Sequence, residues 1–334
     1  MVTMKDIAKH AGVSPITVSR VVNRSGYVGQ ETRARVESAI MELNYIPNLV
    51  ASSLRSSQSD LIALVLPDIT NSFWTSIARG AEDEAWEHGY GVFICNTDNN
   101  VAKEASYIER LLRRRVEGLL LVPTPDIESE VQLRRLQRHG LKFVVVHRRL
   151  QDFPAEVIRS DGESAARALT NALIKSGRRR IAFIGLPFTD TSSADRLQGY
   201  RSSLRSAGVE FNPALVREGD ADHGSGGYHM VRDLLGGENR PDGILLANSR
   251  LALGGLRAIE EANLTFPGDI GVAAFHDINA MDHYAPRLIR AVQPGYRMGQ
   301  LATRRLLQMP IEPNGAYKEV ILQPEIFLPA TAGT

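Results

Sequence analysis

"GVSPITVSRVV", residues 12–22, lies in the first tenth of the chain and has the clearest helix start in the sequence. Ser14 can accept a backbone N–H as an N-cap, and Pro15 takes the first helical position, where its missing N–H costs nothing. Three valines recur at helical spacing and predict a buried side, namely Val18, Val21 and Val22. The stretch therefore predicts a short, well-capped helix that follows a turn at Gly12.

The segments on both sides of this stretch also have helical spacing. Residues 3–12, "TMKDIAKHAG", open with Thr3 as a cap candidate and place apolar side chains on one face. Residues 31–44, "ETRARVESAIMELN", predict a third helix with an apolar face of its own. The apolar positions of the two segments are Ile7, Ala8 and Ala11, then Val36, Ile40 and Leu43. Three short helices with a tight Gly-Val-Ser link between the first two predict a helix-turn-helix unit.

The chain changes character after residue 45. In "YIPNLVASSLRSSQSD", residues 45–60, Pro47 breaks the preceding helix and five serines follow, which predicts a linker with one marginal helical turn at 50–55. From residue 61 short apolar runs such as "LIALVLPD" alternate with amphipathic helices, and the alternation starts again after residue 160. Two rounds of this alternation predict an α/β region of two doubly wound parallel sheets.

Composition and charge limit the class of protein. A length of 334 residues favours two or three domains, and the single Cys95 has no disulfide partner, which fits a reducing compartment. No stretch of 18 apolar residues occurs and the N-terminus lacks the apolar core of a signal peptide, so we expect a cytoplasmic protein with no membrane partner. Residues 1–59 hold seven Lys/Arg against four Asp/Glu, whereas the remainder holds 32 against 34. This asymmetry favours a small N-terminal unit that meets a polyanion.

The motifs of common enzyme classes are missing from the sequence. It has no GxxxxGK[ST] phosphate loop, no GxGxxG between a predicted strand and a helix, no GxSxG and no HExxH. Six histidines lie in unrelated segments and are interpreted as solvated or hydrogen-bonded side chains: His10, His88, His139, His223, His229 and His283. We therefore expect no enzyme, no metal site and no cofactor.

Polar and aromatic side chains follow several predicted strands. "NSFW", residues 71–74, comes directly after the first strand of the large region, at the edge of an open α/β sheet where ligands bind. Phe73 and Trp74 fit two interpretations, a stacking surface for a sugar or base, or the start of a core-packed helix. The candidate ligand-binding residues at the strand ends, in a predicted cleft between the two sheets, are Asn71, Phe73, Trp74, Asp98, His147, Arg148, Asp220, Asn248 and His276.

Longer blocks of the sequence resemble the LacI/GalR family of bacterial transcription repressors. They are "MKDIAKHAGVSPITVSRVVN", "LNYIPNLVASSLRS", "LIALVLPDITNSFW", "VEGLLLV", "ADRLQGYRSSL" and "GGLRAIEEANLTFPGDIGVAAF", and together they cover essentially the whole chain. The later blocks also resemble periplasmic sugar-binding proteins. The resemblance implies a helix-turn-helix headpiece, a hinge helix and a two-lobed, periplasmic-binding-protein-like core in which the chain crosses three times between the lobes.

The resemblance also implies domain boundaries. The headpiece takes residues 1–45, the hinge 46–59 and the effector-binding core 60–334, and the crossings fall near 159–162, 289–293 and 319–322. One lobe then consists of 60–160 and 292–320, and the other of 161–291 and 321–334. The sequence ends in "FLPATAGT" without a heptad extension, so we expect a homodimer with no tetramerising coiled coil.

For DNA, the resemblance makes residues 14–23 the recognition helix of a dimer on a palindromic operator. It places Pro15, Ile16 and Arg20 at base edges, where Arg20 suits a bidentate contact with guanine. It places Ser14, Thr17, Ser19 and Asn23 nearer the phosphates, together with Thr3 and Lys5. In the hinge, Leu54 matches the family's minor-groove wedge, with Ala51 and Arg55 as its neighbours and Tyr45 and Asn48 as anchors.

For the effector, the chain departs from the family's pattern. Sugar-binding members usually carry aspartates at three strand ends where this chain has His147, Ser249 and His276, while Arg196 in "ADRLQGY" matches the effector-contacting arginine. A cleft that loses carboxylates and keeps arginines favours an anion, to which a histidine can also donate when it is protonated. We therefore expect a sugar acid or phosphorylated sugar stacked on Trp74, with its anionic group near Arg196 and His276. The strand end "AAFH" also resembles the gluconate-repressor branch locally. Two alternatives stay open: a neutral sugar or nucleoside as effector, and a cytosolic two-lobed sugar-binding receptor or sugar-modifying enzyme as function.

Overall fold

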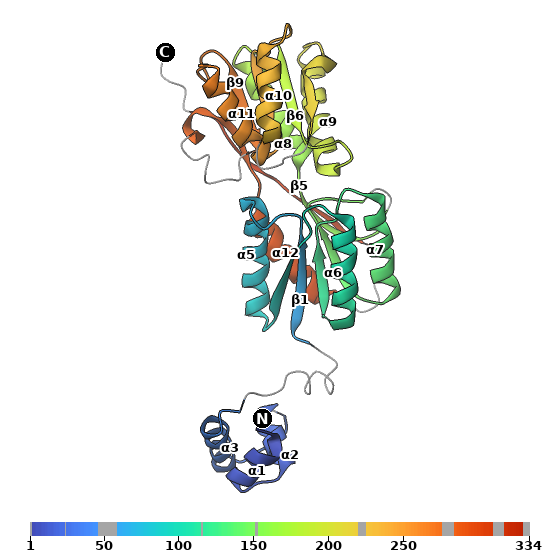
Figure 1. The fold of residues 1–334 in the computed structure, drawn as a ribbon, viewed down its shortest axis with the longest axis vertical. Helices are drawn as coiled ribbons and strands as arrows, with labels where there is room; N and C mark the ends of the chain where they lie inside the picture. The colour runs from blue at the N-terminus through green and yellow to red at the C-terminus, as the bar shows by residue number, and fades with distance from the viewer. Residues whose placement is uncertain are drawn as a thin grey trace. The chain divides into compact units, whose positions relative to one another are not determined.

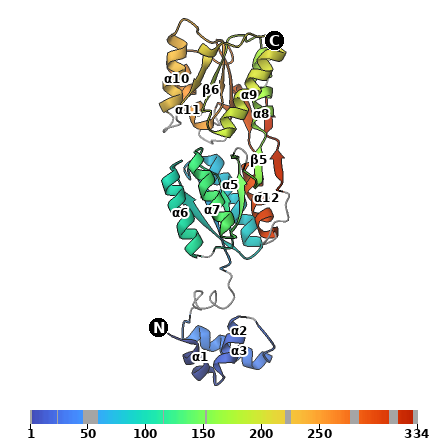
Figure 2. The same ribbon diagram turned by 90° about the vertical axis from the view of Figure 1, so that its right-hand side faces the viewer.

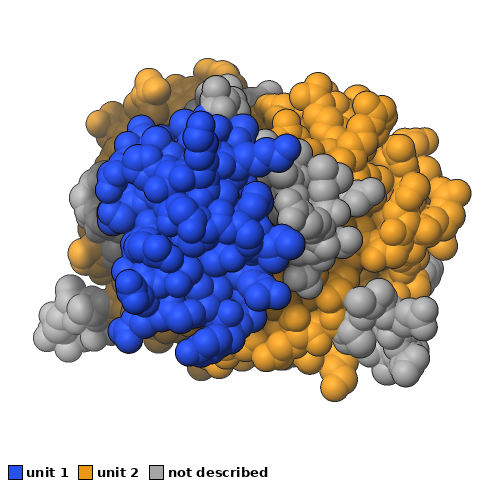
Figure 3. Space-filling model, turned by 90° about the horizontal axis from the view of Figure 1, so that it is seen from below, with its two compact units in different colours: residues 1–59 blue, residues 60–334 orange. Residues whose placement is uncertain are grey.

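The computed structural model describes residues 2–23, 25–45, 59–114, 116–150, 153–219, 225–275, 284–309 and 317–329. It divides into two compact units, residues 1–59 and 60–334, which Figure 3 colours separately. Six predicted site residues lie outside the described residues: Asn48, Ala51, Leu54 and Arg55 of the hinge, and Asp220 and His276 of the core. None of the described helices is long and apolar enough to cross a membrane.

The described part of the first unit contains three helices, α1 (Met4–Ala11), α2 (Pro15–Val22) and α3 (Gln30–Glu42). Gly12 ends α1 in the left-handed conformation, at φ 65°, and so turns the chain into α2. All three helices contribute to a small core, whose buried members are Ile7, Ala8, Ala11, Val18, Val21, Val36 and Ala39. The predicted helix-turn-helix is confirmed, although Val22, Ile40 and Leu43 are only partly buried.

The second unit contains two lobes, each built on a six-stranded sheet (Figures 1 and 2). In the first lobe the strand order is β11-β5-β4-β3-β1-β2, and the described pairings are parallel. The strands are β1 (Leu61–Leu66), β2 (Gly91–Asn96), β3 (Gly118–Leu121), β4 (Lys142–Val146), β5 (Glu156–Ser160) and β11 (Glu319–Leu322). One face is covered by α5 (Ser72–Glu87) and α12 (Gly295–Gln308), the other by α6 (Val101–Arg114) and α7 (Ile127–Arg138).

The second lobe repeats this plan with the strand order β12-β10-β9-β8-β6-β7. Its strands are β6 (Ile181–Gly185), β7 (Val216–Glu218), β8 (Gly243–Leu246), β9 (Gly271–Phe275), β10 (Ile289–Val292) and β12 (Glu325–Phe327). Helices α8 (Gly162–Lys175) and α9 (Thr191–Ser206) pack on one face, and α10 (Ser225–Gly236) and α11 (Ser249–Glu261) on the other. Two 3-10 turns, η1 (Pro213–Leu215) and η4 (Ala285–Arg287), complete the described elements. Because helices cover both faces of each sheet, the inner strands are continuous apolar runs such as "LIALVL".

The chain crosses between the lobes at three places, two of which differ from the prediction. The first crossing joins β5 to α8 at Asp161, within the predicted segment. The second lies at 293–294, after β10, and the third at 323–324, after β11, so residues 289–292 and 319–322 are strands rather than crossings. Leu322 therefore still belongs to the first lobe, and Val292 to the second. The predicted limits were wrong because they fall within the apolar strands β10 and β11, whereas each crossing follows its strand at a Gln-Pro pair, 293–294 and 323–324.

Candidate functional sites

The outer side of α2 is the first candidate site. Ser14 caps this helix, since its hydroxyl accepts a hydrogen bond from the backbone N–H of Thr17 at 3.2 Å. Pro15, Ile16 and Arg20 are exposed, and Ile16 keeps 67% of its surface accessible while Val18 is fully buried. A large apolar side chain and an arginine therefore stand together on the outer side of a rigidly capped helix.

The polar residues expected near phosphates lie around the same helix. Asn23 donates to the Ser19 hydroxyl at 3.1 Å, and the hydroxyls of Ser14 and Thr17 are 2.9 Å apart. Lys5 is exposed, whereas Thr3 is held in the capping box of α1 by Asp6 and Tyr45 packs partly against the headpiece core. The sequence reasoning left out Tyr27, which is 92% exposed in the turn after α2; the signal for it is an aromatic residue in a short turn between two glycines.

The second candidate site is a pocket between the two lobes of the core, at the carboxyl ends of strands from both sheets. Its lining residues are Asn71, Phe73, Trp74, His147, Arg148, Leu186, Asp190, Ser192, Arg196, Asn248, Ser249 and Gln293. Leu186, Asp190, Ser192 and Gln293 are absent from the predicted set. The side chains of the lining residues fill most of the pocket and leave room for little more than a water molecule.

Asp98 is the described candidate that does not line this pocket. Its carboxylate instead accepts hydrogen bonds from Lys103 at 2.6 Å and from Asn96. The next residue, Asn99, reaches the site indirectly, because its side-chain oxygen accepts a hydrogen bond from Arg148 at 2.7 Å. The sequence thus predicts the correct strand end, but the side chain that supports the pocket is that of Asn99, the residue after Asp98.

Three aromatic rings form one wall of the pocket. The ring centroids of Phe73 and Trp74 are 4.7 Å apart, and His147 meets them edge-on at 4.8 and 5.2 Å. Phe73 and Trp74 also begin α5 and pack in the core, so both interpretations of these residues hold. Burial lowers the pKa of the His147 imidazole well below its usual range, and the nearby charge of Arg196 lowers it further. The ring is therefore neutral near pH 7, and the expectation of a protonated, donating His147 is not supported.

Arg148 and Asp190 form a buried ion pair across the pocket, with Nε and Oδ2 2.8 Å apart. Asp190 is also the N-cap of α9 and accepts hydrogen bonds from the backbone N–H and hydroxyl of Ser192 at 2.9 and 2.6 Å. Burial alone would raise the pKa of the Asp190 carboxyl, but the charge of Arg148 and the hydrogen bonds from Ser192 outweigh it and lower the pKa to about 2. The pair therefore stays ionised at neutral pH.

Arg196 supplies a second guanidinium on the α9 side. It donates to the carbonyl of Ala247 at 2.5 Å and to the side-chain oxygen of Gln293 at 3.0 Å, and it stacks 4.0 Å from the ring centroid of Phe275. With His147 neutral, the described lining residues carry two arginines and one carboxylate. The lining therefore has a net positive charge. No group of three His, Cys, Asp or Glu in the described parts of the chain is arranged to hold a metal ion.

A helix-turn-helix unit combined with a two-lobed α/β unit that carries a charged interlobe pocket defines the class of ligand-responsive DNA-binding proteins. Residues 3–48 match the description "Bacterial regulatory proteins, lacI family". Residues 59–325 match "Periplasmic binding proteins and sugar binding domain of LacI family". The chain belongs to the LacI family. It is therefore a transcriptional regulator and not an enzyme.

Relatives and solved structures agree with this assignment. The ribose operon repressor of Escherichia coli (strain K12) is 33% identical over 325 residues, which are 97% of this chain and 98% of the relative. The HTH-type transcriptional regulator RegA of Clostridium saccharobutylicum is 33% identical over 308 residues, 92% of each chain. The crystal structure of the lac repressor dimer bound to operator and the anti-inducer ONPF has a TM-score of 0.85 at 29% identity and covers 97% of each chain.

Proposed function

We propose that this regulator binds a two-fold symmetric operator as a homodimer and that an anionic carbohydrate, a sugar acid or sugar phosphate, controls it. The net positive lining of the interlobe pocket, with Arg196 on its α9 wall, is the observation that carries the effector class. Similar proteins support the proposal of a dimeric, operator-binding regulator, since one is a ribose operon repressor and another was solved as a dimer on operator DNA.

In the headpiece, α2 is the proposed recognition helix. Arg20 reads guanine, while Pro15 and Ile16 offer apolar contacts such as a thymine methyl. Ile16 is 67% exposed, so its side chain is accessible to a thymine methyl, which supports this role. The proposed phosphate-side residues are Thr3, Lys5, Ser14, Thr17, Ser19, Asn23 and, outside the described residues, Arg55. Tyr45 and, also outside the described residues, Asn48 are the proposed anchors of the hinge, in which Leu54 is the minor-groove wedge with Ala51 and Arg55 as its neighbours.

Operator binding is tested with duplexes selected from a randomised palindromic pool and then varied base by base. Arg20→Ala should cost about 1–3 kcal/mol and relax the preference at one position of each half-site. Lys5→Ala, a change to an exposed cation of α1, should instead weaken all duplexes alike and reduce the salt slope by about one. A uniform loss for Arg20→Ala across the variants contradicts its assignment as a base reader.

The effector class is tested by calorimetric titration with glucose, gluconate, glucuronate and glucose 6-phosphate. We expect an anion to bind and Arg196→Ala to weaken it at least about tenfold, because a buried charge-assisted contact is lost. Arg201→Ala, an exposed arginine later in α9, is the matched control and should leave affinity unchanged. Tight binding of glucose that survives Arg196→Ala, with no response to any anion, would favour the neutral-sugar alternative instead.

A further inference from the structure

We propose that Arg250 and Asp68 form an electrostatic gate that closes the interlobe pocket and must open to admit a ligand. The proposal rests on the proposed function only in taking this pocket as the effector site. Arg250 lies in the first turn of α11 in the second lobe, whereas Asp68 lies in the loop between β1 and α5 of the first lobe. Neither residue lines the pocket itself.

The contact spans the rim of the pocket. One Arg250 nitrogen, Nη2, contacts both the Asp68 carboxylate and the Thr70 hydroxyl. Thr70 precedes Asn71 and Arg250 follows Ser249, and both of these neighbours line the pocket from opposite lobes. Among the described residues, these are the only polar contacts that join α11 to the first lobe. Breaking them therefore removes the described polar link between the Asn71 and Ser249 sides of the pocket, while the Arg148–Asp190 pair still joins the lobes after β4.

The place of the gate in the sheet makes it the contact that opens most. Two of the three crossings leave the first sheet at β5 and at its neighbour β11, and β1 lies three strands from β5, whereas β4 lies beside it. At a strand spacing of about 4.8 Å, the gate is about 14 Å from β5 and the loop after β4 only about 5 Å. A rotation of the lobes about the crossings therefore separates Arg250 from Asp68 further than it separates Arg149 from Asp195.

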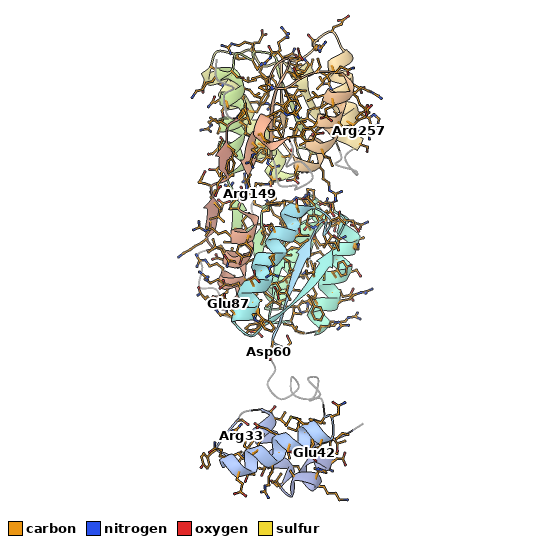
Figure 4. All side chains as sticks on the ribbon, turned by 90° about the vertical axis from the view of Figure 1, so that its left-hand side faces the viewer. Arg33, Glu42, Asp60, Glu87, Arg149 and Arg257 are labelled. Atoms are coloured by element: carbon orange, nitrogen blue, oxygen red, sulfur yellow. The ribbon has the colours of Figure 1, made fainter. Side chains whose placement is uncertain are left out.

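Contacts near the crossings are suited to persist during that rotation. Arg149, labelled in Figure 4, donates to both carboxylate oxygens of Asp195 at 2.7 and 2.8 Å, and its backbone also pairs with the Thr191 hydroxyl. Arg159 of β5 reaches the same carboxylate at 3.5 Å. Several hydrogen bonds and ion pairs join the two lobes near the crossings, whereas one arginine, Arg250, makes the contact at the opposite rim of the pocket. The lobes are therefore held together more weakly at that rim.

Removing the Arg250 side chain leaves both local structures intact. The other oxygen of Asp68 accepts hydrogen bonds from the Thr70 backbone N–H and hydroxyl at 2.8 and 2.7 Å, which keep the loop folded. Asn248 caps α11 by accepting from the backbone N–H groups of Arg250 and Leu251, which does not depend on the arginine side chain. The gate is therefore separable from folding.

The test uses the full chain without ligand and follows acrylamide quenching of Trp74. The chain has two tryptophans, and Trp86→Phe removes the exposed one, so the signal comes from Trp74, which is 8% exposed on the pocket wall. In that background Arg250→Gln and Asp68→Asn should each raise the quenching constant several-fold, and Arg250→Lys should keep it near the parent value. Arg257→Gln is the matched control, because Arg257 pairs with Glu261 on the exposed side of the same helix.

Quenching that stays at the parent value in both Arg250→Gln and Asp68→Asn overturns the gate, and so does an equal rise in Arg257→Gln. Circular dichroism and thermal unfolding of each variant identify any rise that comes from loss of the fold, and a rise accompanied by such loss in both variants also counts against the proposal. Because acrylamide is a neutral probe, failure of the sugar-anion titration leaves this result unchanged, and the two failures are distinguishable.

Discussion

His147 shows how one residue sets the charge of the pocket. It adopts a left-handed conformation, at φ 67°, and its backbone N–H bonds to Ile158 of the adjoining strand, so the ring is fixed against Phe73 and Trp74. In this place burial keeps the imidazole neutral. The positive charge of the pocket therefore comes from the two arginines, which hold it at every physiological pH.

This residue predicts a dependence of stability on pH. Since the pKa of His147 is lowered in the folded protein, the unfolded chain binds a proton below about pH 6.5 that the folded chain does not. Stability should therefore fall as pH decreases below that value, by up to about 1.4 kcal/mol per pH unit from this group. His147→Asn, which tolerates the left-handed conformation, should flatten the slope in urea unfolding between pH 7.5 and 5.

The matched control is His139→Asn, the same change at an exposed histidine after α7. Asp190 does not contribute in this window: its pKa is lowered to about 2, so its stabilisation is present above about pH 4 and is lost only as pH falls toward 2. Equal slopes for the parent and His147→Asn would show that the ring becomes protonated without cost.

Helix starts are the elements that build the pocket. Asn71, Asp190 and Asn248 cap α5, α9 and α11 by accepting a backbone N–H, and all three line the pocket. Three helix N-termini thus face one cavity, an arrangement that favours a negatively charged ligand. The residues that cap these helices are also residues that line the pocket. The sequence pattern that marks a helix start therefore also marks a position of the site.

This coincidence explains which site residues the sequence could reveal. Asn248 lies two residues past β8, and Asn71 lies five residues past β1 but opens the block Asn-Ser-Phe-Trp, so both positions can be identified in the sequence. Asp190 also lies five residues past its strand, β6, but no aromatic pair follows it, and Gln293 belongs to a crossing that only the folded chain brings to the pocket. Local patterns thus predict strand ends and caps, whereas the convergence of distant loops depends on the tertiary fold.

At α2 the cap predicts a measurable effect. Ser14→Ala removes the acceptor for the Thr17 N–H and should cost about 1 kcal/mol of headpiece stability. Operator affinity should fall for all duplexes alike, since the helix frays but keeps its base-reading side chains. Hydrogen exchange at the start of α2 measures the fraying, and Ser25→Ala, an exposed serine in the turn after the helix, is the control. Unchanged exchange in Ser14→Ala argues against the cap.

At the scale of the whole molecule, the repeated strand-helix alternation predicted the two-lobed architecture and the crossing at Asp161. The later crossings were misplaced because β10 and β11 are strands of only four residues, and each crossing comes after its strand, at the Gln-Pro pairs 293–294 and 323–324. The contacts that join the lobes, such as Arg149 with Asp195, are between residues 46 positions apart and leave no local pattern. The arrangement of strands and helices can therefore be predicted from the hydrophobic periodicity of the sequence. The closure of the two lobes depends on a few ion pairs between residues far apart in the sequence, which the periodicity does not reveal.

The edge of the first sheet carries the prediction about assembly. Strand β2 pairs with β1 on one side only, and its sequence "GVFICN" contains no charged residue or proline to protect the open edge. Phe93 and Ile94 are 41% and 52% exposed on this strand. We predict that a second copy of the chain covers this apolar edge, because the proposed two-fold symmetric operator calls for a two-fold symmetric protein.

Ile94→Lys should therefore weaken the dimer at least about tenfold, the effect of losing 1–2 kcal/mol at an interface centre. Sedimentation over a concentration series measures the dissociation constant, and operator affinity should fall with it while sugar binding stays the same. Val131→Lys on α7 is the control, since Val131 is an apolar side chain of similar exposure, 48%, on a helix of the same lobe. A lysine at position 94 would be buried at a symmetric interface beside its own copy, and this pair of like charges is doubly unfavourable. A dimer that survives Ile94→Lys, or one that Ile94→Lys and Val131→Lys weaken equally, would therefore place the contact between subunits elsewhere.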